Sequence, residues 1–245
     1  MKRIVIIGAT SAIAEHCARL WVKEAIDLTL VGRNADKTEL VAADLRVRNP
    51  KSTVRVLAAN FIDPIAINEL IDSIVAIAEV DCVLIAHGSL PEQTECQQDL
   101  TACSDALTVN GISPVLFAEG FAGHMQKVNK GTVAIIGSVA GDRGRKSNYV
   151  YGAAKGLVTR YAQGLQHRLA GTSIKVVLIK PGPTETPMTA HLQGQGKLAR
   201  VEDVAQRIVD GIEKGLPVVY APAKWALIMM IIRHLPRFVF NKLDI

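Results

Sequence analysis

The chain has 245 residues, of which 49% are hydrophobic and 21% charged, and its formal net charge is +5. This size and composition predict one large core and a single domain over residues 1–245. Lys and Arg form no runs with interleaved aromatic residues, and only 4% of residues are aromatic, which argues against a nucleic-acid partner.

Cysteine and histidine spacing gives no support for a metal site. The four cysteines show no Cys-xx-Cys pattern and the six histidines are scattered, so we expect reduced, structural cysteines and no bound metal. The chain begins a strand directly after Met-Lys-Arg and shows no signal-peptide pattern. We therefore expect a cytoplasmic protein.

The first strand is predicted by the apolar run Arg3–Ile7, and the small-residue turn Gly8–Ala14 leads from it into a helix. Backbone N–H groups of such a turn, together with the positive end of the helix, can bind a pyrophosphate. The hydroxyls of Thr10 and Ser11 add two further donors. The turn therefore predicts a dinucleotide site.

A second strand, Leu28–Val31, precedes Gly32, Arg33 and Asn34. A carboxylate at this place would bind the 2′-hydroxyl of an adenosine ribose, whereas an arginine without a carboxylate favours a 2′-phosphate. Arg33 therefore predicts NADP rather than NAD. The alternative is a solvated surface arginine.

The third and fourth strands, Thr53–Leu57 and Asp81–Ala86, lead to Asn60-Phe61 and to His87-Gly88 respectively. Gly88 would allow a ligand ring to lie against the backbone. We expect His87 to be positional rather than catalytic.

A long helical pattern then runs from about Asp99 to Val128, with Asn110 in its middle. Asn is a weak helix former, and within a helix it often marks a local bend or a side chain recruited for function. Taken alone, it is also compatible with a surface or core asparagine whose hydrogen bonds are satisfied.

The pair Tyr151 and Lys155 is the strongest chemical signal in the chain. If residues 149–169 form a helix, the two side chains stand one turn apart on one face, and the ammonium is expected to lower the pKa of the phenol. Tyr149 lies six positions from Lys155 and therefore on a different face. An ordinary helix pair is the alternative for this spacing alone.

Ser138 follows the predicted fifth strand, Thr132–Gly137, and so lies at the carboxyl end of a strand, where open α/β sheets bind ligands. A sixth strand, Ile174–Lys180, leads into a proline-rich loop, and we expect residues 185–200 to form a substrate lid. A helix over 201–215 and a strand over 217–220 follow. Seven strands joined by helical crossovers predict an α/β fold: a single-domain, Rossmann-like, doubly wound parallel sheet with helices on both faces.

Together these motifs resemble the short-chain dehydrogenase/reductases in order and spacing, over essentially the whole chain. The resemblance implies hydride transfer between a nicotinamide cofactor and a carbonyl or alcohol. It implies that Tyr151 exchanges a proton with the substrate oxygen, Ser138 binds that oxygen, Lys155 holds the nicotinamide ribose, and Asn110 supports a water relay. The cofactor-binding residues that it implies are Gly8, Thr10, Ser11, Ala12, Ile13, Arg33, Asn34, Asn60, Phe61, Ala86, His87, Gly88, Tyr151, Lys155, Pro181, Gly182, Thr184 and Thr186.

Three positions depart from the pattern of this family. Ala12 and Ala14 stand where glycine is usual, so a methyl group is expected near the pyrophosphate and another at the contact of helix and strand. Asn60 replaces an adenine-contacting aspartate, which keeps hydrogen-bonding capacity without the charge. Reduced affinity for the cofactor is one expected consequence.

A narrower resemblance covers Gly141–Tyr151, Met188–Leu192 and the tail from Val219 onward, which are similar to the decaprenylphosphoryl-2-keto-β-erythro-pentofuranose reductases. This implies reduction of the 2-keto group of a polyprenylphosphate-linked pentofuranose, the second half of a 2′-epimerisation toward arabinofuranose in cell wall or glycan biosynthesis, with a partner oxidase. Alternatives are a reductase of a soluble ketone or of a 3-oxoacyl thioester, and a non-catalytic, nucleotide-sensing relative. The wider family commonly forms homodimers and homotetramers.

The tail over residues 224–245 supports a lipid-linked substrate independently. Residues 225–232 are apolar, too short to span a bilayer, and flanked by Lys224, Arg233, Arg237 and Lys242. This pattern suits an anionic membrane surface or a polyprenyl phosphate. Arg143, Arg145 and Lys146 are expected to meet the same phosphate. Packing of the tail against the sheet or a second subunit is the alternative.

Overall fold

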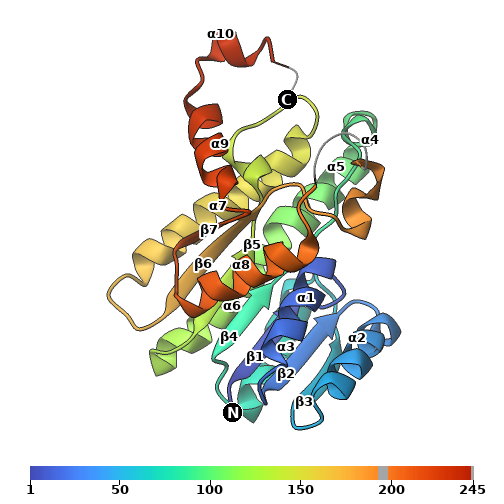
Figure 1. Cartoon of the computed structure of the whole chain (residues 1–245), viewed down its shortest axis with the longest axis vertical. Coiled ribbons are helices and arrows are strands. Elements are labelled where there is room, and N and C mark those ends of the chain that lie inside the picture. The colour runs from blue at the N-terminus through green and yellow to red at the C-terminus, as the bar shows by residue number, and fades with distance from the viewer. Residues whose placement is uncertain (193–197, 244–245) are drawn as a thin grey trace.

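One sheet of seven parallel strands forms the centre of the molecule (Figure 1). The computed structural model describes residues 1–192 and 198–243. The strands lie in the order β3-β2-β1-β4-β5-β6-β7. Along the chain they are β1 (Arg3–Ile7), β2 (Asp27–Gly32), β3 (Thr53–Ala58), β4 (Cys82–Ile85), β5 (Thr132–Ile136), β6 (Lys175–Pro181) and β7 (Val218–Ala221). The strand order reverses between β1 and β4, so the predicted doubly wound fold is confirmed.

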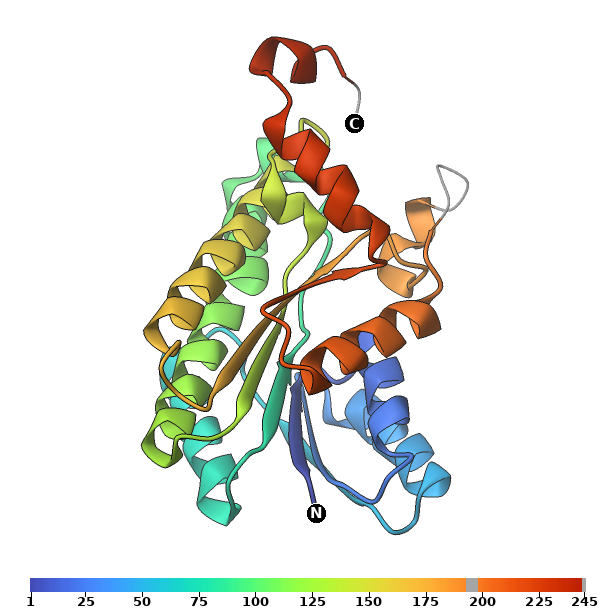
Figure 2. The ribbon, with the colours of Figure 1, turned by 60° about the vertical axis from the view of Figure 1, so that its left-hand side comes forward.

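Helices cover both faces of the sheet, which Figure 2 shows nearly edge-on. One face packs against α1, α2 and α8, and the other against α3, α6 and α7. The bounds are α1 (Ala12–Trp21), α2 (Ala35–Arg48), α3 (Pro64–Ile77), α6 (Ser113–Val128), α7 (Tyr149–Arg168) and α8 (Val201–Glu213). Two hydrophobic cores result, one on each side of the sheet.

Strand β1 shows why the central strands are apolar without alternation. All five of its residues are buried. Ile4 and Ile6 point into the core beneath α1, α2 and α8, whereas Val5 and Ile7 point into the core beneath α3, α6 and α7. Successive side chains of a strand point to opposite faces, so a strand covered on both faces needs apolar residues at every position.

The long helix predicted from Asp99 to Val128 is interrupted at its centre. The chain forms α4 (Gln93–Gln98), then α5 (Leu100–Leu107), a π-helical turn η1 (Thr108–Ile112) and α6. The π-helical turn holds Asn110, which the sequence left open as a local bend, a side chain recruited for function or an asparagine with satisfied hydrogen bonds. Turns of this kind are frequent at functional sites.

Two short 3-10 helices lie at the carboxyl edge of the sheet. η2 (Val139–Asp142) connects β5 to α7, and η3 (Pro187–Leu192) follows β6. An isolated parallel bridge joins Thr184, directly before the predicted lid, to Ala199 near its end, which ties the two ends of this segment together. Residues 193–197 of the predicted lid lie outside the described residues.

The last described segment contains α9 (Lys224–His234) and α10 (Arg237–Phe240). Figures 1 and 2 both place α9 on the side of the molecule where the strands have their carboxyl ends. It contacts β7 and η2. None of the helices over residues 1–192 and 198–243 is both long enough and apolar enough to cross a bilayer.

Candidate active site

Two adjoining cavities open at the carboxyl edge of the sheet. The small cavity, of about 280 Å³, contains Ser138, Tyr151 and Lys155 among its lining residues. The large cavity, of about 1050 Å³, runs past the Gly8 turn to Arg33. They share six lining residues: Ser11, Ile13, His87, Gly88, Thr186 and Met188. The strand order changes direction at this place, which is where doubly wound sheets bind ligands.

The structure brings Ser138, Tyr151 and Lys155 together at the small cavity. Ser138 follows β5, and its Oγ accepts a hydrogen bond from the N–H of Ala140 at 3.1 Å. Tyr151 and Lys155 lie one turn apart near the start of α7, and the hydroxyl of Ser138 hydrogen-bonds the phenol. Lys155 is 2% exposed, and its Nζ donates to the carbonyl of Ile136 at 3.0 Å. The face of α7 that carries Tyr151 and Lys155 therefore lines the cavity.

The expected lowering of the Tyr151 pKa is not what this structure shows. Burial raises the pKa of the phenol, and the hydrogen bond from Ser138 opposes that rise only in part. Burial also lowers the pKa of Lys155 to about 8, because the ammonium is removed from water without a carboxylate partner. The physical reason is that desolvation acts on both groups, whereas their mutual attraction requires both to be charged.

Asn110 is completely buried, and its amide is held at two points. Its Oδ1 accepts from the N–H of Ser89 at 2.9 Å, and its Nδ2 donates to the carbonyl of Ala106 at 2.9 Å. A Cβ at Gly88 would lie 2.8 Å from Oδ1 of Asn110 and 3.7 Å from Nζ of Lys155. Gly88 therefore keeps open the space between these two polar groups.

The Gly8 turn forms the wall of the large cavity. Gly8 has φ +85°, and a Cβ there would lie 2.5 Å from the backbone nitrogen of His87, so only glycine fits. The N–H of Ser11 donates to the carbonyl of Gly8 at 3.0 Å, and α1 begins at the next residue. Ala14 is buried in the core, where its methyl group is accommodated, whereas Ala12 lines the cavity.

Cationic side chains lie at the far end of the large cavity. Arg33 lines it, and so does Lys37 in the first turn of α2, which was not among the residues predicted from the sequence. The side chain of Asn34 accepts from the N–H of Lys37 at 2.9 Å and so caps α2. That hydrogen bond gives Asn34 a structural role besides the predicted contact with cofactor.

Asn60 and Phe61 also line the large cavity, but both take part in the fold. Oδ1 of Asn60 accepts from the N–H of Ile62 at 2.9 Å, which closes the turn before α3. Phe61 is 5% exposed, and its ring packs edge-on against His87 at a centroid distance of 4.7 Å. Ala86 and Thr10 complete the predicted set, lining the small and the large cavity respectively.

His87 lies where the two cavities meet. Its Nε2 is 2.8 Å from Oγ of Ser113, while its Nδ1 is buried with no hydrogen-bond partner among the described residues. Burial first, and then the charges of Lys155 and Arg33, lower the pKa of His87 to about 3. The imidazole is therefore neutral at physiological pH and is not a proton donor there.

The Pro181-Gly182 loop joins the site to the tail. A Cβ at Gly182 would lie 2.0 Å from the indole nitrogen of Trp225 in α9, so the tail packs directly on this glycine. The hydroxyl of Thr184 donates to the carbonyl of Gly182 at 2.9 Å. The hydroxyl of Thr186 is 3.2 Å from that of Thr189. The loop thus keeps its shape through its own threonines.

The three basic residues before α7 do not act as one group. Arg143 points away from the small cavity: its guanidinium donates to the carbonyl of Leu235 at 2.7 Å and lies 3.8 Å from the ring centre of Phe240. Arg145 lines the small cavity. The expectation that all three would meet one phosphate is therefore wrong for Arg143, which binds the tail instead.

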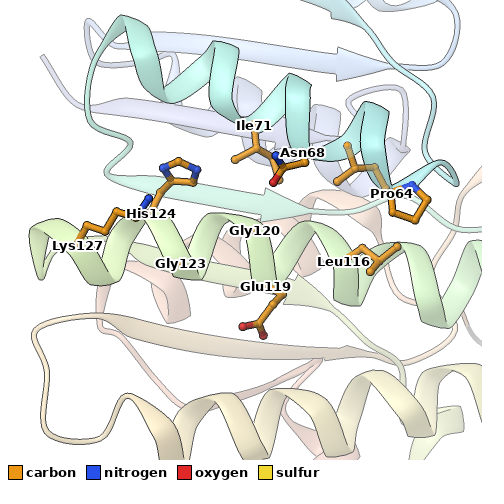
Figure 3. A pocket seen from close by; sticks show the side chains of 10 residues that line it. Pro64, Asn68, Ile71, Leu116, Glu119, Gly120, Gly123, His124 and Lys127 are labelled. Atoms are coloured by element: carbon orange, nitrogen blue, oxygen red, sulfur yellow. The ribbon is translucent and has the colours of Figure 1, made fainter.

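A third hollow, a groove of about 380 Å³, lies between α3 and α6 (Figure 3). Its lining residues include Asn68, Glu119, Gly120, His124 and Lys127. None of the predicted site residues lines it. The chemistry that the sequence predicts therefore belongs to the two cavities at the carboxyl edge.

A doubly wound parallel sheet with a glycine turn after β1 and a Ser, Tyr and Lys set after β5 defines a Rossmann-type oxidoreductase. The family model described as "short chain dehydrogenase" matches residues 2–196. An uncharacterized oxidoreductase of Mycobacterium tuberculosis is 30% identical over 243 residues, which cover 98% of this chain and 96% of the relative. The chain therefore belongs to the short-chain dehydrogenase family.

A further relative is also described as an oxidoreductase, and solved structures share the fold. An uncharacterized oxidoreductase of Streptomyces coelicolor is 28% identical over 99% of this chain and 96% of its own length. A short-chain dehydrogenase from Sphingobium yanoikuyae, in complex with NADPH, has a TM-score of 0.86 at 21% identity, covering 100% of this chain and 97% of that one. A bulky-bulky ketone specific alcohol dehydrogenase from Comamonas testosteroni has a TM-score of 0.82 at 21% identity, covering 100% and 95%. At these identities the two solved structures show the shared fold.

Proposed function

We propose that the protein reduces a ketone with NADPH. The observation that carries this proposal is the convergence of Ser138, Tyr151 and Lys155 on a small cavity that adjoins a larger one at the switch point of the sheet. Two structural neighbours support it: the Sphingobium protein was solved with NADPH, and the Comamonas protein is described as ketone-specific.

The residues of the large cavity fit a dinucleotide with a 2′-phosphate. Gly8 allows the tight turn after β1, and Ala12 and Ile13 at the start of α1 line the cavity, where a helix N-terminus can bind phosphate. Arg33 and Lys37 supply positive charge where the adenosine ribose would lie. Ala12 narrows this turn by one methyl group.

NADPH, when bound, supplies a hydride to the carbonyl carbon. Tyr151 donates its phenolic proton to the carbonyl oxygen as negative charge develops there, and Ser138 donates a hydrogen bond to the same oxygen. Lys155 holds the nicotinamide ribose and favours the phenolate that remains. Asn110, fixed in the π-helical turn, positions water between Lys155 and solvent.

The substrate that we propose is the 2-keto group of a polyprenylphosphate-linked pentofuranose, made by a preceding oxidation. Arg145 in the small cavity provides a positive charge for the phosphate. The tail lies beside the site, because Trp225 packs on Gly182. An apolar helix next to the cavity suits a lipid chain better than it suits a small soluble ketone.

We also propose that α9 and α10 contact the inner face of the membrane, and that the protein is a homodimer or homotetramer. Leu227 and Ile231 of α9 are 60% and 54% exposed, and Phe238 of α10 is 71% exposed. Lys224 and Arg233 are exposed on the same helix. Apolar and cationic side chains together bind anionic lipid surfaces.

The first test is consumption of NADPH and NADH by the purified protein on a polyprenyl-phosphoryl 2-keto-pentofuranose, with soluble ketones and a 3-oxoacyl thioester alongside. NADPH-specific reduction of the lipid-linked ketone is expected. Turnover of the soluble compounds alone would support the reductase activity and rule out the lipid-linked ketone as the substrate. Nucleotide binding without turnover on any compound would favour a sensor.

Tyr151→Phe tests the proton donor. We expect kcat to fall at least about 1000-fold, since general acid catalysis contributes up to about 10⁴-fold and no Asp or Glu is among the described residues that line the small cavity. The Kd for NADPH, measured by fluorescence titration, should change less than about twofold. Tyr149→Phe is the matched control and should retain activity. Retained turnover in Tyr151→Phe would assign the acid to another group.

A further inference from the structure

A tight turn between η2 and α7 presents two polar side chains to the small cavity. The N–H of Asn148 donates to the carbonyl of Arg145 at 3.2 Å, which closes the turn, and both residues line the cavity. Nε of Arg145 and Oδ1 of Asn148 are buried without a hydrogen-bond partner among the described residues. Buried polar atoms are nearly always paired, so two in one turn indicate a missing ligand.

The charge of the small cavity specifies the kind of ligand. No Asp or Glu is among its described lining residues, whereas Arg145 and Lys155 both are. Burial lowers the pKa of Arg145, and no carboxylate of the described residues opposes this shift. A half-buried guanidinium in this situation is most stable when an oxyanion completes its hydrogen bonds.

We propose that Arg145 is the specificity-determining residue of the small cavity and binds an oxyanion of the substrate, a phosphate or a carboxylate, while Asn148 accepts a hydrogen bond from a neighbouring hydroxyl. This assignment rests on the proposed ketone reduction. Asn148 precedes Tyr151 by three residues, and its carbonyl accepts from the N–H of Gly152 at 2.8 Å in the first turn of α7. The anion therefore lies beside the carbonyl that receives the proton, on the same substrate molecule.

The test compares wild type with Arg145→Met and Arg145→Lys on three ketones: the polyprenyl-phosphoryl keto-pentofuranose, a soluble keto-pentose phosphate, and the neutral keto-pentose. In wild type we expect kcat/KM for both charged ketones to exceed that for the neutral one by about 100-fold. Arg145→Met should remove most of this preference and change the neutral ketone less than about threefold. Arg145→Lys should keep part of it, since the charge remains without the planar fork.

Arg160→Met is the matched control. Arg160 is exposed on α7 and bonds Gln163, so its loss removes the same charge without touching the cavity. An equal loss of kcat/KM by Arg145→Met on charged and neutral ketones would reduce Arg145 to a structural role and overturn the proposal. Loss of preference for the lipid-linked ketone alone would restrict the recognised group to the polyprenyl phosphate. If the wild type reduces the neutral ketone with the same kcat/KM as the charged ones, the reductase activity is supported and the proposed anion site is overturned.

A binding measurement decides the matter even if none of the three ketones is reduced. Calorimetric titration of the NADP-saturated protein with inorganic phosphate should give binding that weakens at least about tenfold in Arg145→Met and is unchanged in Arg160→Met. Saturation with NADP occupies the cationic end of the large cavity, so the titration reports the small cavity. Equal phosphate binding by wild type and Arg145→Met would overturn the proposal independently of the reductase activity.

Discussion

At the scale of single residues, Lys155 is an example of a functional group held in an unfavourable state. Its ammonium is 2% exposed, has a carbonyl as its hydrogen-bond acceptor rather than a carboxylate, and has its pKa lowered to about 8. A positive charge in such surroundings destabilises the folded protein, yet it is available to a ligand that enters the cavity.

Lys155→Met should therefore stabilise the protein while abolishing reduction. The folded pKa of Lys155, about 8, lies below the ordinary value of 10.5, so the unfolded chain binds more protons between these pH values. The penalty for the buried ammonium is fully present below pH 8 and is lost as the pH rises to about 10.5. We expect the variant to gain about 2 kcal/mol in urea unfolding at pH 7, after loss of one hydrogen bond, and to gain little at pH 10.5.

Lys23→Met, at an exposed lysine, is the control and should leave the unfolding midpoint unchanged at both pH values. A Lys155→Met protein less stable than wild type at pH 7 would contradict the assignment of a buried, desolvated ammonium.

Arg33→Asp should change the choice of cofactor. Arg33 is exposed at the end of β2 and lines the large cavity, so a carboxylate there repels a 2′-phosphate and can accept from a ribose hydroxyl. We expect Kd for NADPH to rise about 100-fold and Kd for NADH to change less than about threefold in fluorescence titrations. Lys37→Met should raise the Kd for NADPH about tenfold. Arg207→Asp, the same charge change at an exposed arginine of α8, should leave the binding of both cofactors unchanged. If Arg33→Asp weakened the binding of NADPH and of NADH equally, Arg33 would not be the residue that determines the preference for NADPH.

The sequence identifies the residues with strong local signals and misses those whose role depends on where a side chain points. Tyr151 and Lys155 could be placed together because helical spacing determines that contact. Arg143 and Arg145 are two positions apart and chemically identical, yet one binds the tail and the other lines the cavity. That difference comes from the position of α9, which no local pattern encodes.

At the scale of elements, a buried ion pair connects η2, β6 and β7. The carboxylate of Asp142 pairs with Nζ of Lys180, and both side chains are at most 4% exposed. Tyr220 of β7 donates its hydroxyl to the same carboxylate at 2.8 Å. Because Asp142 ends the 3-10 helix that begins after Ser138, this network fixes the loop that carries the serine.

Asp142→Asn should destabilise the protein by about 3–5 kcal/mol, because it leaves the charge of Lys180 buried without a partner. Urea unfolding measures this change. The double variant Asp142→Asn with Lys180→Met should recover at least half of the loss. Tyr220→Phe, the control, removes one hydrogen bond to a charged group and should cost about 2 kcal/mol. A loss below about 1 kcal/mol for Asp142→Asn would show that this network does not hold the loop.

The elements of the sheet could be predicted because a strand buried on both faces reads as an unbroken apolar run. The prediction of one continuous helix from about Asp99 to Val128 was wrong, because a π-helical turn interrupts it. Apolar residues recur at helical spacing on both sides of the π-helical turn, so the pattern by itself indicates helix throughout. Asn110 was the only local indication of this turn.

At the scale of the whole molecule, α9 and α10 form an exposed surface on the side of the carboxyl edge (Figure 2). Leu227, Met230 and Ile231 lie at helical spacing on α9 and are all exposed. No acidic residue occurs from Lys224 to Leu243, whereas Arg233, Arg237 and Lys242 do. An amphipathic, cationic surface of this kind suits an anionic bilayer.

Leu227→Glu with Ile231→Glu should abolish binding to vesicles of phosphatidylglycerol and phosphatidylcholine in equal parts. Sedimentation should show wild type bound, with binding weakened by salt because part of the attraction is electrostatic. We expect the double variant to bind at least about tenfold less, with kcat/KM on a soluble ketone unchanged within about twofold. Leu40→Glu, at a 74% exposed leucine of α2, should bind as wild type does. If the wild type and the double variant bound vesicles equally, this surface would not be the membrane contact, and contact with a second subunit would be the remaining explanation.

The contact between Arg143 and the carbonyls of α9 has a consequence for biosynthesis. A ribosome makes residues 138–155 long before it makes the helix that Arg143 binds and the strand whose tyrosine bonds Asp142. We expect a nascent chain stopped before residue 218 to contain every catalytic side chain and yet to lack the contacts that position Ser138. Enzymatic activity would then appear only late in translation, and premature termination would yield an inert product rather than a partly active one.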